Sequence, residues 1–217
     1  MPFLDDPPRM PGTGASPAEL FARAVPLSGT PGQEYVERRG VPVEVADAAG
    51  VRFDADFGGR VAVVAAVRDR GDDLVSVHGR YLTVIRGQSK MLTIGPGDGV
   101  IVVLGGWRAE PLILVEGLFD ALSLTTCGIP CLATIGRWAR WLSEVAAGRV
   151  AWLAFDASRP GETDAARFAR LLCGADVRRL LPPPACKDWS TALVKCGRIA
   201  VTRWLRDSLS AKPAMLL

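Results

Sequence analysis

From residue 111 onward, short apolar runs alternate with helical segments, and this alternation constrains the fold more than any other feature. Runs such as LILV at 112–115 and VAWLAF at 150–155 are apolar throughout, which is typical of strands buried on both faces. The pattern predicts strands at 112–115, 131–134, 150–155 and 177–180, and helices at roughly 117–127, 138–147 and 161–173. Short connections between such elements favour one parallel sheet with helices on both faces.

The segment before residue 111 has a different pattern of apolar residues, with short helices followed by short strands, and this pattern predicts a smaller, mixed lobe. Short helices are expected at roughly 17–25, 31–39 and 42–49, the first two beginning at capping boxes, Ser16–Glu19 and Thr30–Gln33. Strands are expected at 61–69, 74–82, 90–94 and 99–104, of which the first two form a hairpin around RGDD. The predicted fold class is therefore α/β: a parallel sheet flanked by helices and preceded by a smaller mixed α+β N-terminal lobe.

The chain divides into four predicted segments. They are a flexible arm with a short helix at 1–30, the N-terminal lobe at 31–110, the parallel-sheet domain at 111–181 and a helical extension at 182–217. Two short helices are expected in the extension, at roughly 188–196 and 198–209.

Several classes of protein are excluded by composition. No window approaches the roughly 18 consecutive apolar residues of a transmembrane helix, and the start MPFLDDPPRMPGTG lacks the apolar core of a secretory signal. The five cysteines contain no C-x-x-C pair and His78 is the only histidine, which argues against structural zinc. An odd number of cysteines without a signal predicts reduced thiols and a cytoplasmic location, with no membrane partner.

Positive charge is concentrated in the second half of the chain. Residues 111–217 carry 14 Lys and Arg against 9 Asp and Glu, whereas residues 1–110 carry 12 against 14. Of the 26 cations, 22 are arginine, whose planar fork suits phosphate and hence a polyanionic partner. A G+C-rich gene would give the same arginine bias, so the count alone leaves both explanations open.

Carboxylates follow two of the predicted buried strands. Glu116 comes directly after 112–115, Asp156 follows 150–155, and Asp120 lies one helical turn beyond Glu116. Ligands of open parallel sheets bind beyond the carboxyl ends of the strands, where neighbouring carboxylates would repel unless a cation lay between them. The pattern therefore favours a Mg²⁺-assisted phosphate site. The alternative is that Glu116 and Asp156 only cap the following helices.

Three segments with this strand–helix context resemble the motifs of the Toprim fold. VEGLFDALSL (115–124) is similar to the first motif, ATIG (133–136) to the second conserved turn, and FDASRPGETDAARFARLL (155–172) to the third motif. KDWSTAL (187–193) is similar to a segment that often follows Toprim domains in phage and mobile-element primases.

The N-terminal lobe extends this resemblance. VRDRGDDLVSVHGRYL (67–82) with KMLTIGPG (90–97) resembles the lobe that precedes Toprim in bacterial replicative primases. Over about residues 31–195 the chain thus resembles the catalytic core of bacterial and phage DnaG-type DNA primases, and four motifs in the right order make the resemblance specific.

The resemblance implies roles for individual residues. Glu116 would be the catalytic carboxylate, as metal ligand or general base, Asp156 would hold Mg²⁺ and Asp120 would assist. The implied metal-binding set is Glu116, Asp156 and Ser158, with Mn²⁺ as an alternative to Mg²⁺. The implied contacts to nucleotide or nucleic acid are Arg80, Lys90, Arg137, Arg140 and Lys187. Implied partners are a single-stranded DNA template, nucleoside triphosphates and, as a further candidate, a replicative helicase.

One position departs from the Toprim pattern. The third motif normally carries Asp-x-Asp, whereas this chain has Asp156, Ala157 and Ser158. The loss of one charge should weaken Mg²⁺ binding, unless Glu162 or Asp164 replaces it. The first hypothesis is a Mg²⁺-dependent primase-type nucleotidyltransferase core that serves replication of a phage, a mobile element or its bacterial host. The alternatives are a degenerate, non-catalytic Toprim module that binds nucleic acid and a Toprim-type nuclease.

Overall fold

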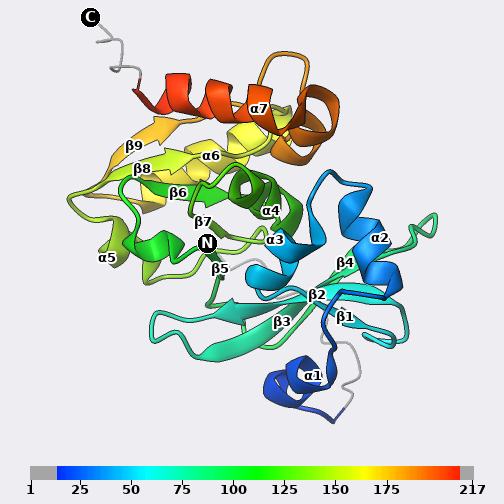
Figure 1. Ribbon diagram of the computed structural model, residues 1–217. Coiled ribbons are helices and arrows are strands. Elements are labelled where there is room, and N and C mark those ends of the chain that lie inside the picture. Colours follow the sequence, from blue (N-terminus) through cyan, green and yellow to red (C-terminus); the bar gives the residue numbers. More distant parts are fainter. Residues whose placement is uncertain (1–13, 211–217) are drawn as a thin grey trace, which may run out of the picture.

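The computed structural model describes residues 14–210 and contains two β-sheets with helices packed around them (Figure 1). Most of the predicted N-terminal arm, and the last seven residues of the predicted helical extension, lie outside the described residues. The N-terminal elements are α1 (Pro17–Arg23), α2 (Pro31–Glu37), α3 (Val43–Ala48), β1 (Arg52–Asp54), β2 (Ala62–Arg68), β3 (Leu74–Tyr81) and β4 (Met91–Ile94). They are followed by β5 (Ile101–Val103), a 3-10 turn at Gly106–Arg108, β6 (Leu112–Val115), α4 (Leu118–Thr126), β7 (Cys131–Ala133), α5 (Leu142–Ala146), β8 (Val150–Leu153), α6 (Arg159–Leu171), β9 (Asp176–Arg179) and α7 (Trp189–Ser210).

The N-terminal sheet is antiparallel, in the order β1-β2-β3-β4. The predicted hairpin is confirmed as β2 and β3, whereas the short edge strand β1 was not predicted. Because side chains alternate along β2, Ala62 and Val64 pack on one face with α1, while Val63 and Val67 join the main core on the other. Gly79 on β3 leaves room for the Phe57 ring, since a Cβ there would lie 2.3 Å from that ring.

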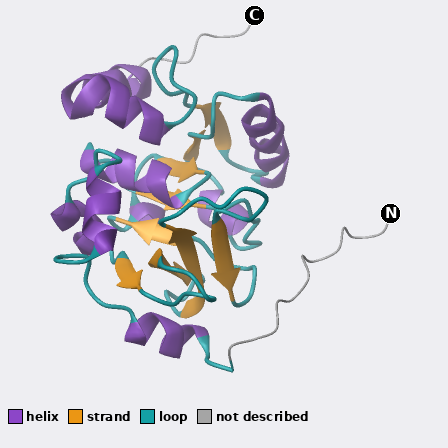
Figure 2. Ribbon diagram, turned by 90° about the vertical axis from the view of Figure 1, so that its right-hand side faces the viewer, coloured by secondary structure: helices purple, strands orange, loops and turns teal. Residues whose placement is uncertain are grey.

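The second sheet has the order β5-β7-β6-β8-β9, with β6 to β9 mutually parallel and β5 antiparallel at the edge. Its central strand β6 is buried at every position, as its apolar sequence predicts. Ile113 and Val115 point to the face covered by α4 and α7, and Leu112 and Leu114 to the face covered by α5 and α6. Figure 2 shows the strands between these helices. The predicted fold class is confirmed.

Three local expectations from the sequence were wrong. The run at 99–104 predicted a strand of the mixed lobe, but its β5 pairs with β7 in the parallel sheet. The helix predicted at 138–147 forms only from Leu142, after a turn. At the start of α2, Thr30 accepts from the Gly32 N–H and Gln33 from the Gly29 N–H, so no capping box forms there.

The remaining helix boundaries agree more closely with the sequence. The capping box of Ser16 and Glu19 is present at α1. The two helices expected near the end of the chain form one element, α7, broken by the non-helical conformation of Gly197.

The two sheets share a continuous core. Val36 and Val67 of the N-terminal part belong to the same buried cluster as Val115 and Leu122 of the second sheet and α4. This shared apolar interior fixes the two sheets against each other. The division of the chain at 30/31, 110/111 and 181/182 stays a prediction. Within residues 14–210, no helix is long and apolar enough to cross a bilayer.

Candidate active site

The order of the strands defines where a ligand would bind. The chain leaves β6 through α4 toward β7 on one side, and leaves β8 through α6 toward β9 on the other. Helices α4 and α6 lie on opposite faces of the sheet. The carboxyl ends of β6 and β8 are thus the point at which the strand order reverses, which is the usual ligand crevice of open α/β sheets.

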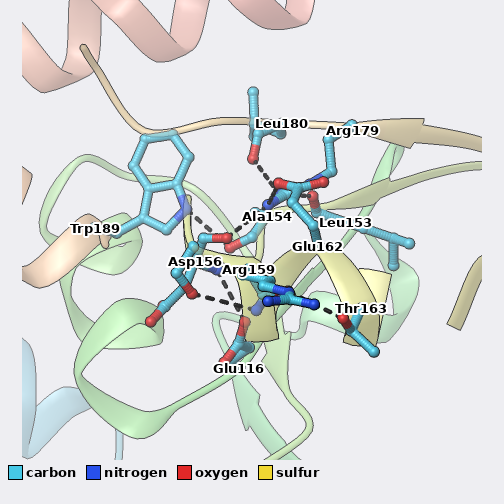
Figure 3. Close-up of polar contacts among 12 residues, drawn as sticks. Glu116, Leu153, Ala154, Asp156, Arg159, Glu162, Thr163, Arg179, Leu180 and Trp189 are labelled. Atoms are coloured by element: carbon cyan, nitrogen blue, oxygen red, sulfur yellow. Dashed lines mark hydrogen bonds and ion pairs between the residues drawn. The ribbon is translucent and has the colours of Figure 1, made fainter. Parts of the chain in front are cut away.

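Glu116 and Asp156 lie at this point. Their strands are direct parallel neighbours, as the sequence predicted, and the Asp156 backbone N–H donates to Oε1 of Glu116 at 2.9 Å (Figure 3). Both side chains are half-buried. Burial raises the pKa of Glu116 and that of Asp156, and the Asp156 charge raises the pKa of Glu116 further. A cation would relieve this repulsion.

The first turn of α6 packs against the backbone of Asp156. Ser158 is the N-cap, and its hydroxyl accepts from the Gly161 N–H at 3.2 Å. Gly161 has no room for a side chain, because a Cβ would lie 2.3 Å from the Asp156 carbonyl oxygen. The Gly of the third motif therefore permits the close approach of α6 to β8. The same contact gives the Ser158 hydroxyl a structural role, and its assignment as a metal ligand stays a prediction.

Arg179, which the sequence did not single out, braces the end of β8 from β9. Its guanidinium donates to the carbonyl oxygens of Leu153 and Asp156, both at 2.8 Å, and to Oε1 of Glu162 at 2.7 Å (Figure 3). Glu162 is thereby held by Arg179. Asp164, in contrast, is close enough for its charge to raise the pKa of Glu116. Asp164 lies 4.0 Å from the Arg167 guanidinium, and its role as a replacement for the missing Asp stays a prediction.

Asp120 joins the carboxylates from the first turn of α4. Its Oδ1 accepts from the backbone N–H groups of Trp189 at 3.1 Å and Ser190 at 3.4 Å. Burial raises its pKa to about 7, with further contributions from the charges of Asp156, Asp188 and Glu116. Asp120 thus joins α4 to α7, and its assisting role in catalysis stays a prediction.

The segment that enters α7 contributes a cation and a fourth carboxylate. Lys187 Nζ lies 3.4 Å from Oδ2 of Asp156. Asp188, absent from the sequence-based candidates, accepts from the Thr191 N–H at 2.6 Å, and its charge raises the pKa of Asp156. Asp188 belongs to the KDWSTAL segment that resembles a primase motif, so the sequence could have indicated it together with Lys187.

Two of the candidate phosphate-binding arginines, on different sheets, affect the same buried histidine. The pKa of buried His78 is lowered to about 4, first by burial and then by the charges of Arg137 and Arg80. Arg80 also donates from Nε to the Tyr35 hydroxyl, at 3.4 Å. Arg137 follows β7 and Arg80 lies on β3, so the charges that act on His78 come from both sheets.

The other two cations are placed differently. Arg140 lies 3.6 Å from Oδ2 of Asp98, and its side chain is 85% exposed. Lys90 is exposed just before β4, and its carbonyl oxygen accepts from the Tyr81 N–H. The structure gives no contact that joins either residue to the carboxylates.

The carboxylates fit one mode of Mg²⁺ binding. Among residues 14–210, no three carboxylate, imidazole or thiolate groups are arranged to hold a metal ion by themselves. Mg²⁺ is commonly held by one or two carboxylates, with water and substrate phosphate completing its shell. Glu116 and Asp156, half-buried and mutually repulsive, fit that mode.

Comparisons with known proteins agree with this geometry. A family model described as Toprim-like matches residues 113–193, and one for a domain of unknown function, DUF7146, matches residues 13–95. The structure resembles a DnaG primase catalytic domain bound to single-stranded DNA, with a TM-score of 0.66 and 19% identity over 88% of this chain and 77% of that one. Comparison with curated protein sequences gives no match.

Two further solved structures have the same fold. The primase fragment of the bacteriophage T7 primase-helicase protein matches with a TM-score of 0.56 and 19% identity, over 80% of this chain and 72% of the fragment. The Aquifex aeolicus primase, with its zinc-binding and RNA polymerase domains, matches with a TM-score of 0.64 and 17% identity, over 88% of this chain and 59% of that one.

The fold and site define an α/β chain with paired carboxylates at the point where the strand order of its parallel sheet reverses. Residues 113–193 match the Toprim-like family model, and the fold of the chain resembles the catalytic core of DnaG-type primases.

Proposed function

We propose that this chain is a Mg²⁺-dependent, primase-type nucleotidyltransferase core that acts on single-stranded DNA in the cytoplasm. It would serve replication of a phage, a mobile element or its bacterial host, with a replicative helicase as a further partner. The observation that carries the proposal is the pairing of Glu116 with Asp156 at the carboxyl ends of adjacent parallel strands. The primase fold of the most similar structures supports it, and one of those primases is bound to single-stranded DNA.

The charges around the crevice suit a triphosphate substrate. Glu116 and Asp156 would hold Mg²⁺, or Mn²⁺ in its place, which when bound supplies positive charge to the triphosphate. Lys187, beside Asp156, adds a cation at the same edge. Arg80 and Arg137 would bind the phosphates of template or nucleotide.

Glu116 is also suited to proton transfer. Its pKa is raised by burial and by neighbouring carboxylates, which makes its carboxylate a better proton acceptor than an exposed one. If Asp156 holds the metal ion without it, Glu116 would instead accept the proton of the attacking 3′-hydroxyl. The Asp156 N–H fixes the orientation of this carboxylate.

Primer synthesis on single-stranded DNA tests the proposal. Labelled nucleoside triphosphates are supplied with Mg²⁺ or with Mn²⁺, and products are separated by length. We expect short primers from the parent chain and a loss of at least about 100-fold in Glu116→Gln, because a general base or metal ligand is removed. Glu34→Gln, which alters an exposed glutamate on α2, is the matched control.

A non-catalytic module that binds nucleic acid is the second candidate, and Ser158 favours it. Serine stands where the Toprim pattern carries a second carboxylate, and its hydroxyl caps α6. This candidate predicts no synthesis with either metal, and DNA binding that Glu116→Gln leaves unchanged. Shortening of the labelled DNA in place of primer synthesis would indicate the Toprim-type nuclease.

A further inference from the structure

Two cysteines face each other at the entry to α7. The Sγ atoms of Cys186 and Cys196 are 3.9 Å apart, although ten positions separate the residues in the chain. Cys186 is buried and Cys196 is exposed. One thiol is thus accessible to a reagent in solution, and the other lies within reach of the first.

The backbone on both sides of the pair has an unusual conformation. Ala185, immediately before Cys186, has a φ of 65°, a left-handed conformation that costs free energy for a residue with a side chain. Gly197, immediately after Cys196, interrupts the helical conformation of α7. Cys186 thus follows a left-handed residue, and Cys196 lies at the break of α7.

The pair encloses the segment that supports the carboxylate crevice. The Lys187 carbonyl oxygen accepts from the Ala157 N–H at 2.7 Å. Trp189 donates its backbone N–H to Asp120 and its indole N–H to the Ala154 carbonyl oxygen, at 3.1 and 2.9 Å. A covalent bond between Cys186 and Cys196 would therefore restrain the segment that makes these contacts.

We propose that Cys186 and Cys196 form a dithiol site that a small-molecule disulfide of the glutathione class converts into an intrachain disulfide. The exposed Cys196 sulfur attacks one sulfur of oxidised glutathione, breaks its S–S bond and releases one glutathione thiol. The Cys186 sulfur then attacks the Cys196 sulfur and releases the second glutathione thiol. The two protein thiols are oxidised, the small disulfide is reduced, and the two thiol protons end on the two glutathione molecules.

Formation of the Cys186–Cys196 disulfide would restrain the segment beside the carboxylates without adding a chemical group to their site. The bond removes conformations of the unfolded chain and of the 187–195 segment, which raises the thermal midpoint by about 5 °C. Hydrogen exchange at the Trp189 and Ala157 amides should slow, because their partners are held more firmly. Reduction with dithiothreitol should reverse both effects, and neither readout depends on primer synthesis.

The test treats the full chain with oxidised glutathione, blocks the remaining thiols and maps disulfides by mass spectrometry. We expect a disulfide between the peptides that contain Cys186 and Cys196, a loss of two free thiols from the five and no retained glutathione on either residue. Cys173→Ser, which removes the other exposed cysteine, should preserve the linkage and the shift in midpoint.

Cys196→Ser is the decisive variant, since its position is exposed and the fold should tolerate it. It should lose both the linkage and the shift. Glutathione retained on Cys196 of the parent chain would show that Cys186 cannot attack it and would overturn the proposal. A parent chain whose two thiols stay free while Cys173 reacts would overturn it as well.

Discussion

The carboxylate of Asp120 on α4 accepts the backbone N–H of Trp189, the first residue of α7, at 3.1 Å. The positive end of α7 favours the ionised form of Asp120. Burial and the charges of Asp156 and Asp188 oppose it, and their effect is larger, since the pKa rises to about 7. One group thus joins two helices and titrates near neutral pH.

The first prediction is that Asp120→Asn changes how stability depends on pH. Because the folded pKa is about 7 and the ordinary value is 3.8, the folded chain binds a proton that the unfolded chain lacks between these values. The contribution of Asp120 to the free energy of unfolding therefore falls as pH rises from about 4 to about 7. Asp120→Asn should abolish this decrease, because asparagine does not titrate in this pH range. Urea unfolding in a metal-chelating buffer, near pH 5 and near pH 8, measures it.

The control for this prediction is Asp207→Asn, which alters an exposed aspartate on α7. Relative to the parent chain, Asp120→Asn should gain stability between pH 5 and pH 8, because only the parent loses the Asp120 contribution over that range. A difference that is the same at both pH values would contradict the raised pKa.

The second prediction concerns Arg179, whose guanidinium holds three carbonyl oxygens and Glu162. Arg179→Gln leaves these partners incompletely satisfied, at a cost of about 2–4 kcal/mol in the free energy of unfolding. Arg178→Gln is a matched control on the same strand, because Arg178 is similarly buried but pairs with the exposed Asp176 and lies over the Trp152 ring, and its loss should cost about 1 kcal/mol. Equal losses in denaturant titrations would rule out the bracing role.

The apolar runs and the charges at their ends made the fold and part of the site predictable. Strand β6 is apolar at all four positions, so its burial and the exit of Glu116 at its end follow from local sequence. The same holds for β8 and Asp156. A run such as 99–104 indicates a strand but not its partner, which is why β5 was assigned to the wrong sheet.

The missed residues act through contacts that local sequence does not encode. Arg179 lies in an ordinary strand pattern, and only the pairing of β9 with β8 brings its side chain to Asp156. In the sequence, Asp188 is indistinguishable from an ordinary N-cap residue. It lies near the other carboxylates because α7 packs on α4. The strand β1 has three residues and one large apolar side chain, too little for a periodic signal.

The third prediction separates two arginines that the sequence treated alike. Arg137 is partly exposed near Arg80 and His78, whereas Arg140 is paired with Asp98. Arg137→Ala should weaken binding of single-stranded DNA by about tenfold and reduce the slope of log K against log salt by about 1. Arg140→Ala should have a smaller effect. Fluorescence anisotropy at several salt concentrations measures both, and identical slopes for the two variants would contradict the difference.

The last prediction concerns Ser158, whose hydroxyl caps α6 at the position where the Toprim pattern has a carboxylate. Aspartate is as good an N-cap as serine, so Ser158→Asp should leave the metal-free stability within about 0.5 kcal/mol, whereas Ser158→Ala should cost about 1 kcal/mol. The added charge beside Asp156 should tighten Mg²⁺ binding by about tenfold and raise primer synthesis. Mg²⁺ binding is followed through the rise in thermal midpoint with Mg²⁺ concentration, which chelation reverses.

Asp164 decides between the two results that Ser158→Asp can give. Its charge already acts on Glu116, so a further carboxylate could increase repulsion instead of completing the site. In that case Ser158→Asp would weaken Mg²⁺ binding, and the double variant Ser158→Asp with Asp164→Asn would restore it. If primer synthesis is absent in the parent chain, in Ser158→Asp and in the double variant, with Mg²⁺ and with Mn²⁺, the enzyme hypothesis is wrong and the chain is a binding module.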